Sequence, residues 1–289
     1  MKKAIDILVG IVGWGIAFIL LAFAVRIFVF DQFSIPSDSM EPTLIPGDHI
    51  LVNKLVFGAR IYKNFDFLEG KEMESWRTWG WRKIRRNDVV VFNYPWAHSK
   101  KGISFAIDKV YVKRCIGLPG DTLSIRNGIY CNPAVPDSTL GYLRGQLDLS
   151  RTRPEDLDPK VLRSLKRGEP ETRWNIKELG PLYIPRRGGT VELDSTNYKL
   201  YGSVIRYETG NPLVYRNGKL FAGDREIRSY TFLKDYYFMG GDNVLNSRDS
   251  RYWGFLPEEY IIGVATRVLY SENPHTEDIR WKRTLKKLK

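Results

Sequence analysis

A long uncharged segment near the N-terminus constrains this chain more than any other feature. Ile7 to Val25 is 19 residues without a charged side chain, and after Arg26 the apolar residues continue to Phe30. As a helix at ~1.5 Å per residue, the uncharged part spans roughly 29 Å, close to the hydrocarbon thickness of a bilayer. The segment therefore predicts a membrane-spanning anchor over residues 1–30.

A cleavable secretory signal is the alternative for this segment. Lys2 and Lys3 form a basic start, and Ala22-Phe23-Ala24 has the small-x-small pattern of a cleavage site. The apolar core of such a signal is normally ~7–15 residues long. This run is longer, and more apolar chain follows the candidate site, so an uncleaved anchor is favoured.

Charge indicates both orientation and partners. Lys2 and Lys3 precede the span, whereas no Lys or Arg follows Arg26 until Lys54. This bias favours an inside N-terminus and an outside C-terminal domain. The formal net charge of +12 indicates an anionic partner, and for an outside domain that partner is expected to be anionic membrane lipid and not nucleic acid.

The rest of the chain has mainly the patterns of β-strands. Alternating or continuous apolar runs bounded by turn residues predict strands, and Asn-Gly pairs predict tight hairpins. These expectations fall on residues 88–92, 109–116, 190–193, 236–239 and 261–270, with hairpin turns at 127–128 and 217–218.

A polar, proline-punctuated stretch interrupts this β pattern. Its composition predicts short helices, for example from Pro159 to Arg167. Ser195 is expected to cap a further helix that carries Tyr198, Tyr201 and Ile205 on one face. We therefore expect an insertion over residues 132–230, whose role the sequence does not reveal.

Cysteine and histidine content gives little support for metal or cofactor chemistry. Cys115 and Cys131 are the only two cysteines. They can be bridged outside the cytoplasm, but their spacing does not decide between a bridge and free thiols. The three histidines lie far apart in sequence and form no zinc signature. No metal and no cofactor are expected.

A serine-rich segment follows the anchor directly. Ser39 lies nine residues beyond Phe30, so even an extended chain places it within roughly 30 Å of the membrane. Pro36 and Pro42 stiffen the backbone around it. A serine hydroxyl held there could act as a nucleophile if a base activates it. A Ser/Pro-rich juxtamembrane linker is the alternative interpretation.

A lysine within an apolar strand is the candidate base. Lys113 and Arg114 are adjacent, so on a strand their side chains point to opposite faces, and one can be buried while the other is solvated. Burial lowers the pKa of a lysine, and a neutral amine can accept the proton of a serine. The alternative is that both are surface cations on an edge strand.

A third segment, residues 240–255, combines glycines, amides and charges ahead of Trp253. Such a loop can supply many hydrogen bonds, and Asp249 and Arg251 can form an ion pair that fixes it. A solvated turn rich in Asx residues is the alternative.

Together the three segments resemble the bacterial type I signal peptidases. Pro36 to Leu44 match the family's Pro-Ser-x-Ser-Met-x-Pro-Thr-Leu motif, with Gly47-Asp48 and Val52-Asn53-Lys54 following it. Tyr111 to Asp121 match its lysine motif, and Gly241 to Gly254 match its Gly-Asp-Asn…Asn-Ser-x-Asp-Ser-Arg-x-Trp-Gly motif.

The resemblance implies a fold and a domain arrangement. The expected fold is mainly β, with a single N-terminal transmembrane helix, a β-rich signal-peptidase catalytic domain, and a mixed α/β insertion. The anchor is residues 1–30, the catalytic domain residues 31–131 and 231–270, and the basic C-terminal tail residues 271–289. The expected location is the bacterial inner membrane, with the N-terminus cytoplasmic and the catalytic domain on the outer face.

The resemblance also implies roles in a serine endopeptidase that removes signal peptides from exported preproteins. Ser39 would be the nucleophile and Lys113 the general base. The Ser37 hydroxyl and the Ser39 backbone N–H would form the oxyanion hole, and Ser247 would orient the lysine amine. Pockets for small residues at positions −1 and −3 would be lined by Phe33, Ile35, Met40, Leu44, Tyr111 and Val112.

One departure concerns the third motif. The resemblance implies that an ion pair between Asp249 and Arg251 supports the loop. Val244-Leu245 stands where the family usually has Arg-Asp, so a charged contact is missing and the rigidity of the loop is in question. Two other functions stay open: a Ser-His-Asp protease using His49 or His98, and a membrane-tethered inactive homologue or binding module.

A segment dense in tryptophan and basic residues predicts a second membrane contact. Trp76, Trp79 and Trp81 lie among cations between residues 71 and 86, a composition that favours the headgroup region. The tail from Arg280 to Lys289 contains six further cations and Trp281. The alternative is a solvated basic loop whose tryptophans pack into the core.

Overall fold

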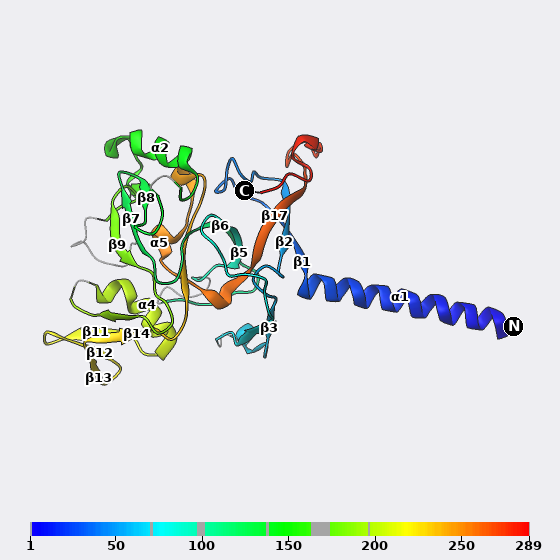
Figure 1. The fold of residues 1–289 in the computed structure, drawn as a ribbon, viewed down its shortest axis with the longest axis horizontal. Helices are drawn as coiled ribbons and strands as arrows, with labels where there is room; N and C mark the ends of the chain where they lie inside the picture. The colour runs from blue at the N-terminus through cyan, green and yellow to red at the C-terminus, as the bar shows by residue number, and fades with distance from the viewer. Residues whose placement is uncertain are drawn as a thin grey trace.

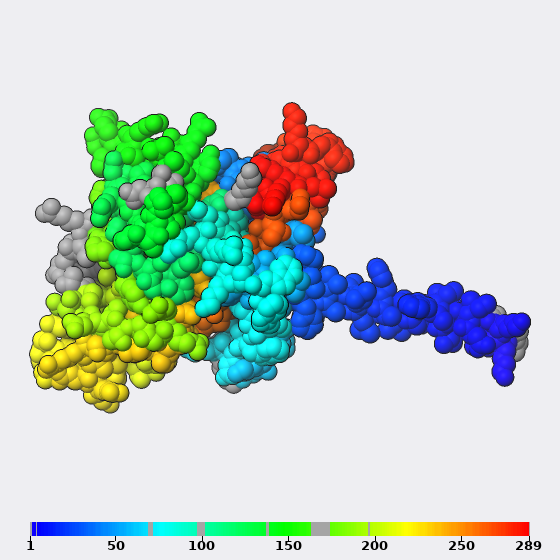
Figure 2. Space-filling view, viewed as in Figure 1, coloured from blue at the N-terminus to red at the C-terminus, as the bar shows by residue number. Residues whose placement is uncertain are grey.

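The computed structural model describes residues 2–69, 72–96, 102–136, 139–162, 174–195 and 197–288. Helix α1, Lys2–Phe28, projects from a β-rich body as a single rod (Figures 1 and 2). Its segment Ile5–Phe28 has a mean hydropathy of 2.6 and is not buried by the rest of the chain. By length and composition this helix could cross a membrane.

A seven-stranded sheet forms the centre of the body. Its neighbours all pair antiparallel, in the order β1-β2-β17-β5-β6-β15-β16. The strands are β1 (Phe30–Ser34), β2 (Asp48–Asn53), β17 (Ile261–Ser271), β5 (Val89–Asn93), β6 (Val110–Gly117), β15 (Tyr236–Gly240) and β16 (Leu256–Pro257). The fold is therefore mainly β, as the sequence predicts.

Within the described residues, four smaller sheets accompany this centre. They contain β3 (Arg60–Tyr62) with β4 (Ser75–Arg77), β7 (Thr122–Arg126) with β8 (Ile129–Cys131) and β9 (Leu179–Tyr183), β10 (Thr190–Glu192) with β14 (Ser229–Thr231), and β11 (Leu213–Arg216) with β12 (Lys219–Ala222) and β13 (Arg225–Ile227). Along the long axis of Figure 1, β3 lies on the side from which α1 leaves, and β11–β13 lie at the opposite end.

Both predicted Asn-Gly hairpins are present. Asn127 and Gly128 have φ of 46° and 80° between β7 and β8, and Asn217 and Gly218 have φ of 51° and 77° between β11 and β12. Positive φ at both central residues is the geometry of a type I′ turn, which Asn and Gly tolerate best.

The helices differ in part from the sequence predictions. Helices α2 (Leu143–Arg151), α3 (Pro159–Leu162) and α4 (Tyr198–Thr209) lie within the 132–230 segment. The predicted helix after Pro159 is described only to Leu162, and residues 163–167 lie outside the described part. The N-cap of α4 is Asn197, two residues after the expected Ser195.

The 132–230 segment shares the core of the β body. Strand β9 pairs with β7, and Tyr201 of α4 stacks on Phe255 with ring centroids 5.9 Å apart. Leu182, Val204 and Phe255 belong to the same buried hydrophobic cluster. The segment therefore packs onto the central sheet and contributes residues to the same hydrophobic core.

The end of α1 is bonded directly to the sheet. Strand β1 begins two residues after Phe28, and the backbone N–H of Lys54 donates to Val29 O at 2.8 Å. The Lys54 Nζ donates to Arg26 O at 2.8 Å and pairs with Asp31 at 2.9 Å. Lys54 therefore caps the C-terminus of the helix, where a cation is favourable.

Candidate active site

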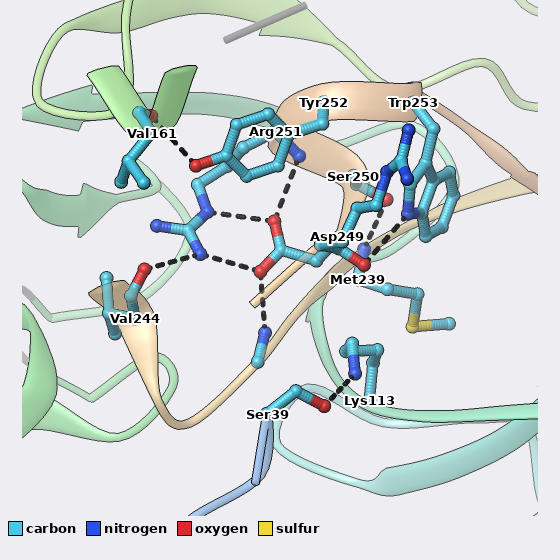
Figure 3. A network of polar contacts seen from close by, with 12 residues as sticks. Ser39, Lys113, Val161, Met239, Val244, Asp249, Ser250, Arg251, Tyr252 and Trp253 are labelled. Carbon is cyan, nitrogen blue, oxygen red and sulfur yellow. Dashed lines mark hydrogen bonds and ion pairs between the residues drawn. The ribbon is translucent and has the colours of Figure 1, made fainter. Parts of the chain in front are cut away.

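The central sheet and the loop after β1 bring Ser39 to Lys113. Lys113 lies in the middle of β6, and its Nζ donates to Ser39 Oγ at 2.5 Å and to Val112 O at 3.0 Å (Figure 3). Only 4% of Lys113 is exposed. The two residues are 74 positions apart in sequence, so the contact depends on the fold and not on local structure.

Burial changes the acidity of this amine. Removal from water lowers the pKa of Lys113 from 10.5 to about 8, although the nearby carboxylates of Asp249 and Asp242 oppose this change. At pH 7 a group with that pKa is neutral in roughly one molecule in ten. A neutral amine at hydrogen-bond distance is able to take the serine proton.

Arg114 differs from the sequence prediction. Both Lys113 and Arg114 are buried, whereas solvation of one of them was expected. Arg114 points to the other face of the strand, where its Nε and Nη2 donate to Asp242 at 2.7 and 2.5 Å. The opposite charge makes burial of this guanidinium possible.

Asp242 and Thr43 are functional candidates that sequence reasoning did not single out. Thr43 Oγ1 donates to Asp242 Oδ2 at 2.5 Å, and Arg114 Nη2 lies 3.2 Å from Thr43 Oγ1. These contacts join the loop after Ser39 to the strand that carries Lys113. In the sequence, Asp242 lies in one motif and Arg114 in another, which was the available signal. Only the fold shows that these two residues form an ion pair.

Backbone contacts join the serine segment to the loop of residues 241–254, here called the catalytic loop. The Asn243 N–H donates to Ser39 O at 3.2 Å, and its side chain donates to Asp38 O at 3.2 Å. Asn246 Nδ2 donates to Asp38 Oδ2 at 2.7 Å. The position of Ser39 therefore depends on this loop as well as on β1.

An internal ion pair organises the catalytic loop (Figure 3). Asp249 accepts from Arg251 Nε at 2.8 Å and Nη2 at 2.7 Å, and from the Gly241 N–H at 2.9 Å. Burial alone would raise the pKa of Asp249, but the charge and hydrogen bonds of Arg251 hold that pKa below its usual value. Both side chains are almost fully buried, and the loop has the ion pair that its sequence predicts.

The two expected helpers of the dyad have different surroundings. Ser37 Oγ lies 3.4 Å from Ser39 Oγ on the exposed side of the segment. The Asp249 carboxylate lies close enough to Ser247 for this hydroxyl to help lower its pKa. Ser247 Oγ is buried, and its expected bond to the Lys113 amine is not formed in this structure. Its place against Gly241 explains why that position lacks a side chain, since a Cβ there would lie 2.0 Å from Ser247 Oγ.

Five of the six predicted pocket residues belong to one apolar cluster. Ile35, Met40 and Leu44 are buried in it, and Phe33 and Val112 pack against it. Tyr111 belongs to the larger cluster on the other side, where it stacks on Tyr94 at 4.6 Å. The Lys113 amine lies 5.7 Å from the Tyr111 ring. Tyr111 therefore adjoins the dyad and not the apolar cluster that contains the other five residues.

The remaining candidates lie elsewhere. His49 stacks on Tyr270 at 4.1 Å, and its Nε2 is 3.3 Å from Glu272, so its described partners do not include Ser39. His98 lies outside the described residues. Cys115 and Cys131 are not bridged to each other. Within the described ranges no group of three or more His, Cys, Asp or Glu residues is placed to hold a metal ion.

Comparison with known proteins identifies relatives of this chain. A profile of the family "Signal peptidase, peptidase S26" matches residues 8–158 and 188–270. The signal peptidase I of Buchnera aphidicola subsp. Schizaphis graminum is 31% identical over 286 residues, which is 91% of this chain and 76% of that protein. The signal peptidase I of Pseudomonas aeruginosa is 31% identical over 274 residues, 90% of this chain and 73% of that protein.

A solved signal peptidase I from Enterococcus faecalis is also similar, with 21% identity over 63% of this chain and 97% of the other. Its TM-score of 0.26 is too low to establish a shared fold. The sequence matches alone show that the chain is a serine peptidase, a hydrolase. It belongs to the bacterial type I signal peptidases of peptidase family S26.

Proposed function

We propose that this protein cuts signal peptides from exported preproteins with Ser39 as nucleophile and Lys113 as general base. The observation that carries the proposal is the buried Lys113 amine 2.5 Å from Ser39 Oγ. Lys113 takes the hydroxyl proton as Ser39 Oγ attacks the scissile carbonyl, and gives it to the leaving amine. A water deprotonated by Lys113 then hydrolyses the acyl-enzyme ester and frees Ser39.

The oxyanion of each tetrahedral intermediate needs donors. The Ser39 N–H and the Ser37 hydroxyl lie on the same short segment as the nucleophile, and we assign the oxyanion hole to them. Donors that are already in place stabilise charge as it develops and cost no reorganisation in the reaction. The two buried carboxylates near Lys113 would favour its protonated form during that step.

Substitution of the base tests the dyad. Lys113→Arg should be as inactive as Lys113→Ala on a preprotein with an Ala-x-Ala site, because an arginine stays protonated. His98→Ala should retain near wild-type activity. An active Lys113→Arg together with an inactive His98→Ala would favour a histidine-based mechanism. Full activity in Ser39→Ala would mean that a contaminating peptidase cuts the preprotein. It would favour the alternative of an inactive homologue or binding module.

The pocket residues support specificity for small side chains at −1 and −3. The cluster around Ile35, Met40 and Leu44 is packed and apolar, so a bulky side chain would have to displace protein atoms. Overfilling a packed apolar site commonly costs ~1–3 kcal/mol. Preproteins with Ala, Gly or Ser at −1 should be cut and those with Leu or Phe should not. Efficient cutting of the bulky set would contradict this assignment.

We further propose that α1 anchors the enzyme in the bacterial inner membrane, with the N-terminus cytoplasmic and the catalytic domain outside. The support is the exposed apolar surface of the helix, which no part of the chain covers, and the basic N-terminal flank. Protease added to intact spheroplasts should digest the β body. If the β body were protected from the protease, the opposite orientation would be indicated.

A second membrane contact through the tryptophan segment is also proposed. Trp76, Trp79 and Trp81 are 53%, 81% and 61% exposed, so the alternative in which they pack into the core is wrong. The cations around these tryptophans are less available for contact with lipid headgroups than the sequence indicates, because several of them have partners within the protein. Arg77 donates to backbone carbonyls including Ile261 O at 2.8 Å, and salt bridges engage two further arginines of the segment, Arg82 with Asp88 and Arg86 with Asp121.

This arrangement favours docking by tryptophan more than by charge. A soluble form beginning at Val29 retains β1 and isolates the question. It should bind vesicles containing anionic lipid, should lose only part of this binding at high salt, and should lose most of it when the three tryptophans become alanine. Tyr215→Ala, at the opposite end of the body, is the control. Unchanged binding by the triple variant would rule out this docking surface.

A further inference from the structure

Helix α2 of the 132–230 segment packs directly on the backbone of the catalytic loop. At Gly145 a Cβ would lie 2.6 Å from Asp242 O and 3.0 Å from Val244 Cγ2. Such distances leave no room for any side chain, so the glycine allows the helix to approach the loop closely. Asp242 is the residue that binds both Arg114 and Thr43.

The side chain of Val244, in the catalytic loop, also packs against the 132–230 segment. It is 2% exposed and packs in a small apolar cluster with Leu149 of α2, Leu157 and Ile176. These partners all come from the 132–230 segment. A hydrogen bond from Tyr252 OH to Val161 O at 2.8 Å adds a polar contact between the same two regions.

A short chain of contacts connects Val244 to the serine segment. Val244 O accepts from Arg251 Nη2 at 3.0 Å, and Arg251 holds Asp249, which in turn accepts from the Gly241 N–H (Figure 3). On the other side of Val244, Asn243 donates to Ser39 O. A displacement of Val244 would therefore reach both carboxylates near Lys113 and the backbone of the nucleophile.

We infer that α2 and the Val244 cluster position the catalytic loop, so that apolar packing against the 132–230 segment holds this loop in place. Gly145, Leu149 and Val244 are positioning residues, since none of them is placed against Ser39 or Lys113. The inference rests on the proposed Ser39–Lys113 mechanism and gives the 132–230 segment a role in it.

Two matched pairs of variants test the inference in the full-length protein in detergent. Gly145→Ala forces a collision with the loop, whereas Gly202→Ala adds the same atom on α4 where no heavy atom lies within 4 Å. Val244→Ala and Val204→Ala each remove the same two methyl groups from a buried valine. Val204 lies in the large hydrophobic cluster and not in the small cluster that holds Val244.

The readouts are Tm, kcat and KM on a preprotein well below each Tm. Gly145→Ala should lower kcat about tenfold or more with KM within about twofold, because small misplacements of reacting groups act on the transition state. Gly202→Ala should match wild type. Val244→Ala and Val204→Ala should both lower Tm, but only Val244→Ala should lower kcat, by about threefold or more.

A purely structural role gives a different result. If Val244→Ala behaves like Val204→Ala, with a lower Tm and an unchanged kcat, the inference is wrong. The same conclusion follows if Gly145→Ala is folded and fully active. Failure of the proposed dyad is recognised separately, as activity retained in Ser39→Ala, and these variants do not bear on it.

Discussion

Replacement of Lys113 by methionine should inactivate the enzyme and make it more stable. The folded protein holds this amine at a pKa of about 8, against 10.5 when it is exposed. Because the unfolded chain binds the proton more tightly, the lysine destabilises the folded state by up to about 3 kcal/mol below pH 8. The penalty decreases as pH rises from about 8 and is gone above the unfolded value of 10.5. Methionine has a similar length and no charge to bury.

Thermal unfolding of the full-length protein in detergent measures this effect at several pH values. For a body of this size, about 3 kcal/mol corresponds to a rise in Tm of roughly 6–12 °C at pH 7. The rise should shrink as pH increases toward 10.5. Lys83→Met replaces an exposed lysine and is the control, with no change expected. A Tm for Lys113→Met equal to wild type at pH 7, or a difference that does not depend on pH, would refute the reasoning.

Three further outcomes are expected. The kcat/KM of the wild type should increase about tenfold per pH unit below pH 8 and level off above it, because activity requires the neutral amine whose pKa is about 8; a flat profile from pH 6 to 9 would contradict this. Ser247→Ala should lower kcat more than it changes KM if substrate binding brings its hydroxyl to the Lys113 amine, and an effect confined to KM would exclude that role. Arg283→Gln should lower stability at pH 7 by about 3 kcal/mol, because Asp48 would remain buried without its ion-pair partner. Arg283 holds the pKa of Asp48 below its usual value of 3.8 although burial opposes this, so the loss should shrink only as pH falls below 3.8 and through the folded pKa, and an equal loss at pH 7 and at about pH 2 would argue against the ion pair.

The sequence predicted the features that depend on short stretches of chain. The hairpin at Asn127-Gly128 follows from the conformations available to those two residues. The apolar helix follows from composition alone. Ser39 and Lys113 were found because each lies in a distinctive motif, and the fold then places them within 2.5 Å of each other.

Features that depend on distant pairings were not predictable in the same way. Burial of Arg114 depends on Asp242, 128 residues away in sequence. The packing of Val244 depends on residues of the 132–230 segment, which carries none of the diagnostic motifs. Arg283 of the basic tail donates to Asp48 and to Thr43 O at 3.1 Å, a pairing that the composition of the tail does not indicate. In each case a charged or apolar group found its partner only through the folded arrangement.

The attachment of α1 to the sheet has a consequence for where substrates are cut. With Lys54 bonded to both the end of the helix and Asp31, there is no free length of chain between the anchor and β1. With α1 in the membrane as proposed, the height of Ser39 above the bilayer surface is fixed by the protein. A preprotein whose apolar segment ends too near to its cleavage site, or too far from it, presents the wrong bond at that height. The enzyme would in this way select for spacing as well as for small side chains.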